Sequence, residues 1–86
     1  MSRKRIIELT DETGRSWTGV LEGTNIAWVD QRSGAKGFEI VAFNSDGSFR
    51  TVSKSSNIGN TSLYDVDGRF YNDDGSPSGR FTVRDA

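Results

Sequence analysis

The sequence predicts a small single-domain all-β protein, an antiparallel meander closed into a barrel or a compact sandwich. Three observations support this class. No window places apolar residues at the helical i, i+3, i+4 spacing for three turns. β-branched and aromatic residues recur instead in short runs. Glycine and aspartate bound most of these runs, as expected for tight turns between strands.

The chain of 86 residues is long enough for one domain with one modest core. We expect that domain to span residues 1–86, with residues 1–4 as a flexible basic N-terminus. The expected strands are 4–11, 15–22, 25–30, 37–44, 48–54, 61–67, 68–72 and 80–85.

The first two connections each fix a register. In DETGR (11–15), a three-residue loop that ends at a left-handed Gly14 predicts the pairs Leu9 with Trp17 and Ile7 with Gly19. In EGTN (22–25), a two-residue turn with glycine first predicts the pairs Leu21 with Ile26 and Gly19 with Trp28. Both registers put the same side chains on one face, and Gly19 leaves room there for the indoles. The predicted core is Ile7, Leu9, Trp17, Leu21, Ile26 and Trp28.

Further along the chain, NSDGS (44–48) predicts another three-residue loop. Its register pairs Phe43 with Phe49 and Ile40 with Val52. The strand before it, 37–44, is apolar on both faces, which favours a strand covered on both sides or one that crosses a barrel corner. A closed or nearly closed barrel therefore fits better than a flat sheet.

A short pattern, a glycine followed by a polar residue and a phenylalanine, occurs three times in the second half of the chain. It consists of the triplets 47–49 (GSF), 68–70 (GRF) and 79–81 (GRF), separated by unequal spacings. Unequal spacings exclude a repeat of fixed period. Each triplet is expected to mark the start of a strand after a turn.

The stretch DVDGRFYNDDGSPSGRF (65–81) raises the question of a calcium site. An EF-hand loop started at Asp65 fails at positions 5, 6 and 12, where Arg69, Phe70 and Ser76 stand. The sequence favours Asp67-Gly68 and Asp74-Gly75 as turn dipeptides whose side chains bond nearby amides. An irregular calcium site remains the alternative, formed by Asp65, Asp67, Asp73 and Asp74.

Composition excludes several kinds of function. The chain has no cysteine and no histidine, so most hydrolase triads and transition-metal sites are excluded. We expect a protein that is not an enzyme and has no cofactor. A net charge of −1 argues against a protein that coats nucleic acid or membrane. The opening MSRKRIIELT lacks the apolar run of a signal peptide, so a cytoplasmic location is expected.

The function expected by exclusion is a protein-interaction module, such as an adaptor, an inhibitor or a structural component of an assembly. Long polar loops are where binding tends to lie, and the chain has two, at 30–37 and 53–62. The expected partner-binding residues on or near them are Arg32, Lys36, Arg50, Lys54, Asn57 and Asn60. The alternative is a small barrel that binds nucleic acid through basic residues and Tyr64, Tyr71 and Phe38 as stacking platforms. Homo-oligomerisation stays open.

Overall fold

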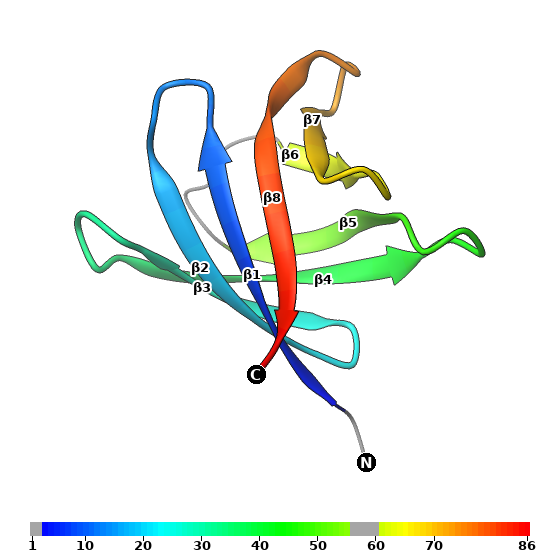
Figure 1. Cartoon of the computed structure of the whole chain (residues 1–86), viewed down its shortest axis with the longest axis horizontal. Helices are drawn as coiled ribbons and strands as arrows, with labels where there is room; N and C mark the ends of the chain where they lie inside the picture. The colour runs from blue at the N-terminus through cyan, green and yellow to red at the C-terminus, as the bar shows by residue number, and fades with distance from the viewer. Residues whose placement is uncertain (1–2, 56–60) are drawn as a thin grey trace.

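A computed structural model describes residues 3–55 and 61–86 of the chain. Within them, eight antiparallel strands pair in sequence order, and the last strand pairs with the first, so the sheet is a closed barrel (Figure 1). This confirms the all-β meander and selects the barrel over the sandwich. The strands are β1 (Lys4–Asp11), β2 (Ser16–Glu22), β3 (Asn25–Asp30), β4 (Lys36–Phe43), β5 (Phe49–Ser55), β6 (Thr61–Tyr64), β7 (Arg69–Asn72) and β8 (Pro77–Asp85).

The first two hairpins have the predicted register. Leu9 pairs with Trp17, and Gly19 pairs with both Ile7 and Trp28 on its two sides. All six predicted core residues are at most 5% exposed. Gly19 leaves room for an indole, because a Cβ built on it would lie 2.6 Å from Cε3 of Trp28.

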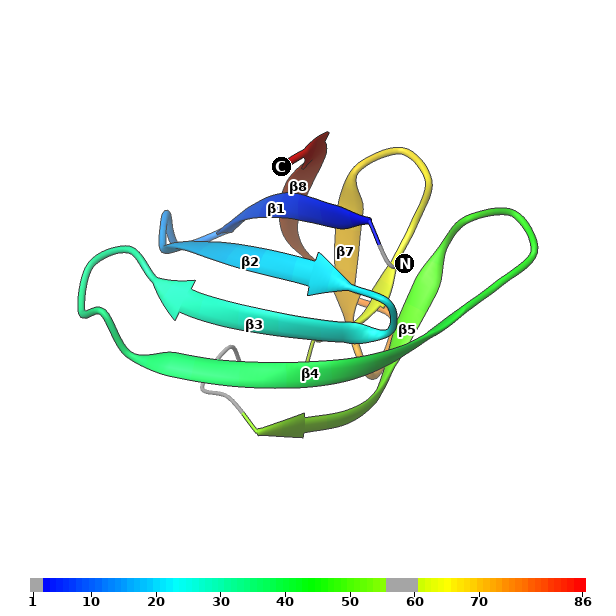
Figure 2. The ribbon, with the colours of Figure 1, turned by 90° about the horizontal axis from the view of Figure 1, so that it is seen from below.

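The β4–β5 hairpin has the predicted register only near its turn. Phe43 pairs with Phe49 as expected, but Ile40 pairs with Ser53, so the predicted partner Val52 is wrong. The register shifts between Ile40 and Val41. Val52 is the extra residue on β5, and such an irregularity bends the strand that carries it, so β5 changes direction along its length (Figure 2).

The C-terminal strand differs most from the prediction. β8 begins at Pro77 instead of residue 80, so the triplet 79–81 lies inside a strand and does not start one. The other two triplets follow turns as expected, because Gly47 and Gly68 have φ of 93° and 86°. Gly79 is needed for close approach, since a Cβ on it would lie 2.2 Å from the carbonyl oxygen of Thr10.

Two of the turns are copies of one another. Residues 44–48 (NSDGS) and 72–76 (NDDGS) share the pattern Asn-x-Asp-Gly-Ser. In each, the asparagine Nδ2 donates to the serine Oγ at 2.9 Å. Oδ1 of Asp46 or Asp74 accepts from the serine N–H at 2.9 Å and from its hydroxyl at 2.6 Å. These bonds lower the pKa of both aspartates, the serine hydroxyl being the main cause.

One carboxylate lies inside the barrel. Glu39 is 0% exposed and points into the core from β4. Its Oε1 accepts from the Trp28 indole at 2.7 Å and from the Tyr64 hydroxyl at 3.0 Å, and its Oε2 accepts from the Thr51 hydroxyl at 2.8 Å. Burial first, and then the charge of Glu39, raises the pKa of Tyr64 well above its ordinary value. Glu39 thus joins Trp28, Thr51 and Tyr64 in one polar network inside the barrel, in which the tyrosine stays protonated.

Candidate functional site

A hollow lies on the surface where β7, β8 and the end of β1 meet. Its volume is about 510 Å³. We call it the arginine hollow, and its lining residues are Thr10, Asp11, Glu12, Arg69, Tyr71, Pro77, Gly79 and Arg80.

A strand irregularity shapes one wall of the arginine hollow. Phe70 pairs with Gly79, but the next residue, Tyr71, pairs with Pro77. Ser78 is therefore the extra residue on β8, and its carbonyl accepts from the backbone N–H of Glu12 at 2.9 Å. The shift sets a tyrosine and a proline opposite each other as an apolar wall.

Two arginines give the hollow its chemistry. Arg69 and Arg80 pair directly across β7 and β8, and Thr10 pairs with Arg80 on its other side. Like charges directly opposite each other destabilise a sheet, and the charge of Asp65 offsets that of Arg69 in part, since Arg69 helps to lower the pKa of Asp65. Among the described residues, Arg80 has no ion-pair partner. Its planar guanidinium can grip a carboxylate with two parallel hydrogen bonds.

Tyr71 is fixed by a neighbour outside the hollow. Its hydroxyl donates to Oδ2 of Asp65 at 2.9 Å, and this bond raises the pKa of Tyr71. Burial opposes ionisation of Asp65, but bonds from the Arg69 N–H, the Tyr71 hydroxyl and the Asp67 N–H outweigh it and lower the pKa of Asp65. Tyr71 is thus held as a neutral phenol beside the arginines.

Asp11 and Glu12 bring negative charge to the rim. Asp11 is already engaged, since its Oδ1 accepts from the backbone N–H groups of Thr13 at 2.9 Å and Arg15 at 3.0 Å. With Arg69 and Arg80, the two acids make the formal charge of the lining zero. A compact anion fits such a lining better than a long polyanion, which both acids would repel.

The structure separates the residues predicted to bind a partner. Arg32 and Lys36 lie in or next to the β3–β4 turn, whereas Arg50 follows the β4–β5 turn. These two turns lie at opposite ends of the barrel (Figure 1). All three residues are exposed. Lys54 lies in β5. Asn57 and Asn60 fall outside the described residues, as do the other residues of 56–60 in the loop that carries them.

The predicted polar loop at 30–37 is anchored to the barrel at its start. Asp30 is 3% exposed and forms an ion pair with Arg15. Its Oδ1 also accepts from the Arg32 N–H at 2.8 Å and the Ser33 N–H at 3.3 Å. The bond from Arg15, followed by those backbone bonds, lowers the pKa of Asp30 to about 2.

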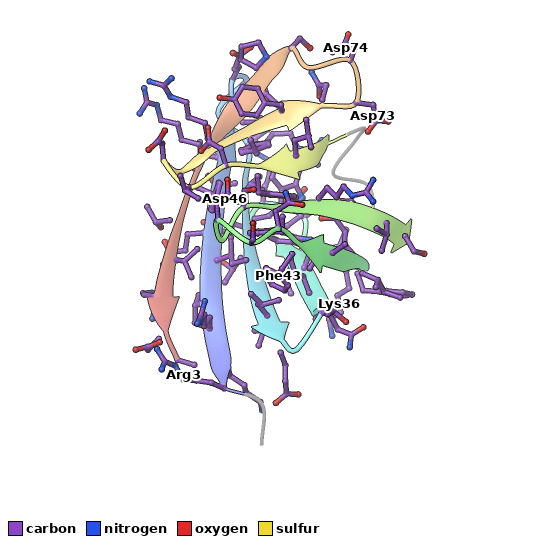
Figure 3. All side chains as sticks on the ribbon, turned by 90° about the vertical axis from the view of Figure 1, so that its right-hand side faces the viewer. Arg3, Lys36, Phe43, Asp46, Asp73 and Asp74 are labelled. Carbon is purple, nitrogen blue, oxygen red and sulfur yellow. The ribbon has the colours of Figure 1, made fainter. Side chains whose placement is uncertain are left out.

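The aspartates of 65–81 lie in two separate turns. Those turns are at opposite ends of the four-residue strand β7, roughly 13 Å apart at strand geometry. Asp74 bonds a nearby amide as predicted, but in the other turn the acceptor is Asp65 and not Asp67. Figure 3 shows Asp73 and Asp74 together at one tip of the barrel. No group of three acidic side chains that could hold a metal occurs among the described residues.

The three aromatic residues expected as stacking platforms do not lie together on one surface of the part of the chain that the structure describes. Tyr64, expected as a platform, is 1% exposed and lies in the core against Phe49, with 4.5 Å between ring centroids. It is inward-facing because it alternates with the exposed Leu63 along β6. Phe38 is 50% exposed, but it lies on β4, away from Tyr71 in the arginine hollow.

The sequence does contain a signal for the arginine hollow. Arg69 and Arg80 are the middle residues of the two GRF triplets. The sequence prediction places both triplets at the starts of strands and therefore does not pair Arg69 with Arg80. The two residues lie opposite each other because β8 begins earlier, at Pro77.

The chain matches no family model, and neither curated proteins nor solved structures gave a match. In the described part of the chain, no helix has the length and apolar character needed to cross a membrane.

Proposed function

We propose that this protein is a non-enzymatic interaction module that binds an acidic segment of a protein partner in the arginine hollow. The observation that carries the proposal is the direct pairing of Arg69 and Arg80 inside a hollow of about 510 Å³. A partner carboxylate between the two guanidiniums would relieve their mutual repulsion and satisfy both forks.

The walls support a peptide as the occupant. Tyr71 and Pro77 offer apolar surface for a flanking side chain of the partner. Tyrosine and arginine are also the residue types enriched at binding hot spots. The rim acids Asp11 and Glu12 suit a segment that carries a donor or cation beside its carboxylate, and they disfavour nucleic acid.

The test is binding of the purified full chain to an array of short peptides of varied Asp and Glu content. The strongest peptide is then titrated against the wild type and variants in solution. Arg80→Ala and Arg69→Ala should each weaken binding about tenfold or more, the loss expected for a charge-assisted contact. The matched control is Arg50→Ala, an exposed arginine on β5 that does not line the hollow.

Other outcomes would overturn the proposal in distinct ways. Selection of neutral or basic peptides would exclude an acidic ligand. Loss of binding in Arg32→Ala and Lys36→Ala, with Arg80→Ala unaffected, would place the interface at the β3–β4 end. Tighter binding of a single-stranded oligonucleotide than of any peptide, weakening steeply with salt, would favour nucleic acid.

A further inference from the structure

A second candidate site lies at the end of the barrel opposite the β1–β2 and β3–β4 turns. The β2–β3, β4–β5 and β6–β7 turns surround this end, on the right-hand side of Figure 2. The inward rows of three strands reach the opening here. Arg5 continues the row of Ile7 on β1, Phe43 continues that of Val41 on β4, and Val83 continues that of Phe81 on β8.

Apolar side chains gather at this opening without being covered. Phe43 is 45% exposed, Val83 is 43% exposed, and Val66 from the β6–β7 turn is 61% exposed. Below them lie core residues that are almost fully buried, among them Leu21 and Phe49. Exposed apolar side chains that gather over a hollow are typical of a binding site, whereas single apolar side chains scattered over a surface are not.

The hollow at this end has two adjoining parts. One, of about 220 Å³, lies between the turns, and the other, of about 340 Å³, lies beside β2. They share Arg5, Leu21 and Phe43. We call the two together the Arg5 mouth. The β4–β5 and β6–β7 turns meet over it, since a Cβ on Gly47 would lie 3.9 Å from Cγ1 of Val66.

Arg5 is the cation at this mouth that is free to meet a ligand. It has no ion-pair partner among the described residues, whereas Arg3 beside it holds Asp85 at 2.8 Å. Asp65 also lines the mouth, but both of its oxygens are engaged: Oδ1 by two backbone N–H groups and Oδ2 by Tyr71, all at 2.9 Å. The site therefore offers apolar walls, one available positive charge and one satisfied carboxylate.

We propose that the Arg5 mouth binds a small amphipathic carboxylate, with its anionic head on the Arg5 guanidinium and its alkyl chain against Phe43, Val66 and Val83. The size of the hollow suits a small molecule, because ligand sites are typically about 300–1,000 Å³. The mouths of β-barrels are also a common place for such ligands. The proposal does not depend on the arginine hollow.

Decanoate is a suitable probe, used below its micelle concentration and followed by amide and methyl NMR shifts of the full chain. Saturable shifts are expected at Val66, Val83 and Phe43, with decanol bound several-fold more weakly because it lacks the charge. Arg5→Gln should weaken decanoate binding about threefold to tenfold and leave decanol binding unchanged. The matched control is Lys4→Gln, which removes a neighbouring cation from the outward row of β1.

Val66→Ser tests the apolar wall without touching the core, since Val66 lies in an exposed turn, and it should weaken both probes. Arg80→Ala should leave decanoate binding intact, which separates this proposal from that for the arginine hollow. Equal affinity for decanoate and decanol, equal losses in Arg5→Gln and Lys4→Gln, or shifts located at Arg69 and Arg80 would each overturn the proposal. Non-saturating shifts spread over the surface would show an adventitious additive only.

Discussion

Trp28 donates its indole N–H to Glu39 inside the closed barrel, with 2.7 Å between Nε1 and Oε1. Both side chains are at most 1% exposed, so neither group has water as an alternative partner. A buried donor that loses its acceptor carries the full desolvation cost. The pair therefore ties the stability of β3 to that of β4 through one contact of the polar network that Glu39 forms inside the barrel.

The Trp28 ring contributes more than its N–H. Trp28→Ala should cost roughly 3–5 kcal/mol in unfolding free energy, because it opens a large cavity. Trp28→Phe keeps an aromatic ring and removes the donor to Glu39, so it should cost less. Urea unfolding followed by circular dichroism measures both. Equal losses for Ala and Phe would mean that the hydrogen bond, and not the packing, dominates.

Two substitutions distinguish the role of the Glu39 oxygens as hydrogen-bond acceptors from the role of its charge. Glu39→Leu should destabilise by about 2–5 kcal/mol, since it leaves the donors of Trp28 and Tyr64 without an acceptor. Glu39→Gln keeps one oxygen for those two donors and should retain most of the stability. Thermal melts at neutral pH compare the two variants. A leucine variant as stable as the glutamine variant would contradict the role of Glu39 as an acceptor.

Gly19 is required because the Trp28 ring occupies the space beside its Cα. Gly19→Ala should destabilise by about 1–3 kcal/mol through overpacking, since its Cβ would meet the Trp28 ring at 2.6 Å. Thr18→Ala, on the outward face of the same strand, is the matched control and should change little. A Gly19→Ala protein with an unchanged melting temperature would show that the indole can move aside.

The two Asn-x-Asp-Gly-Ser turns, 44–48 and 72–76, predict equal losses of stability when their glycines are substituted. Gly47→Ala and Gly75→Ala should each cost roughly 1–2 kcal/mol, because both glycines are left-handed and no neighbour lies closer than 3.9 Å to the added Cβ. Chemical denaturation of the two single variants gives the comparison. A loss of unfolding free energy well above about 2 kcal/mol in either variant would contradict the open space that the structure shows beside that glycine.

The low pKa of Asp30 predicts that the folded protein loses stability in acid. Its folded-state pKa of about 2 lies below the ordinary value of 3.8, so protonation favours the unfolded chain. The contribution of Asp30 is therefore fully present above about pH 4 and is lost as the pH falls toward 2. Asp30→Asn should show a shallower fall of unfolding free energy across that window. An unchanged slope would mean that Arg15 does not stabilise the carboxylate in solution.

The core could be predicted from sequence because short loops fix it locally. A three-residue loop at 12–14 and a two-residue turn at 23–24 determine the registers of the first three strands, and with them the positions of Trp17 and Trp28. The prediction failed where registers depend on distant strands. The shift after Ile40 and the early start of β8 follow from bending and closing the sheet, which no single turn specifies.

The candidate sites could be predicted less well than the core, for the same reason. Arg69 and Arg80 become neighbours only through the β7–β8 pairing, and Arg5 and Val66 meet only at the end of a closed barrel. Charged residues near long loops are the signal available in the sequence, and they indicate Arg32 and Lys36, whose role in binding stays a prediction. The inward position of Glu39 was also missed, since a glutamate in an apolar strand gives no sign of its three donors.

The seam between β1 and β8 has a consequence for how the chain folds. Its contacts join residues as far as 82 positions apart, as in the bond from Arg3, next to β1, to Asp85. Every other strand pair in the barrel joins neighbours in sequence. During synthesis the ribosome releases β1 long before β8, so the nascent sheet keeps two unpaired edges until its final segment emerges. Closure of this seam is therefore the step at which we expect refolding to be slowest and a chaperone to matter most.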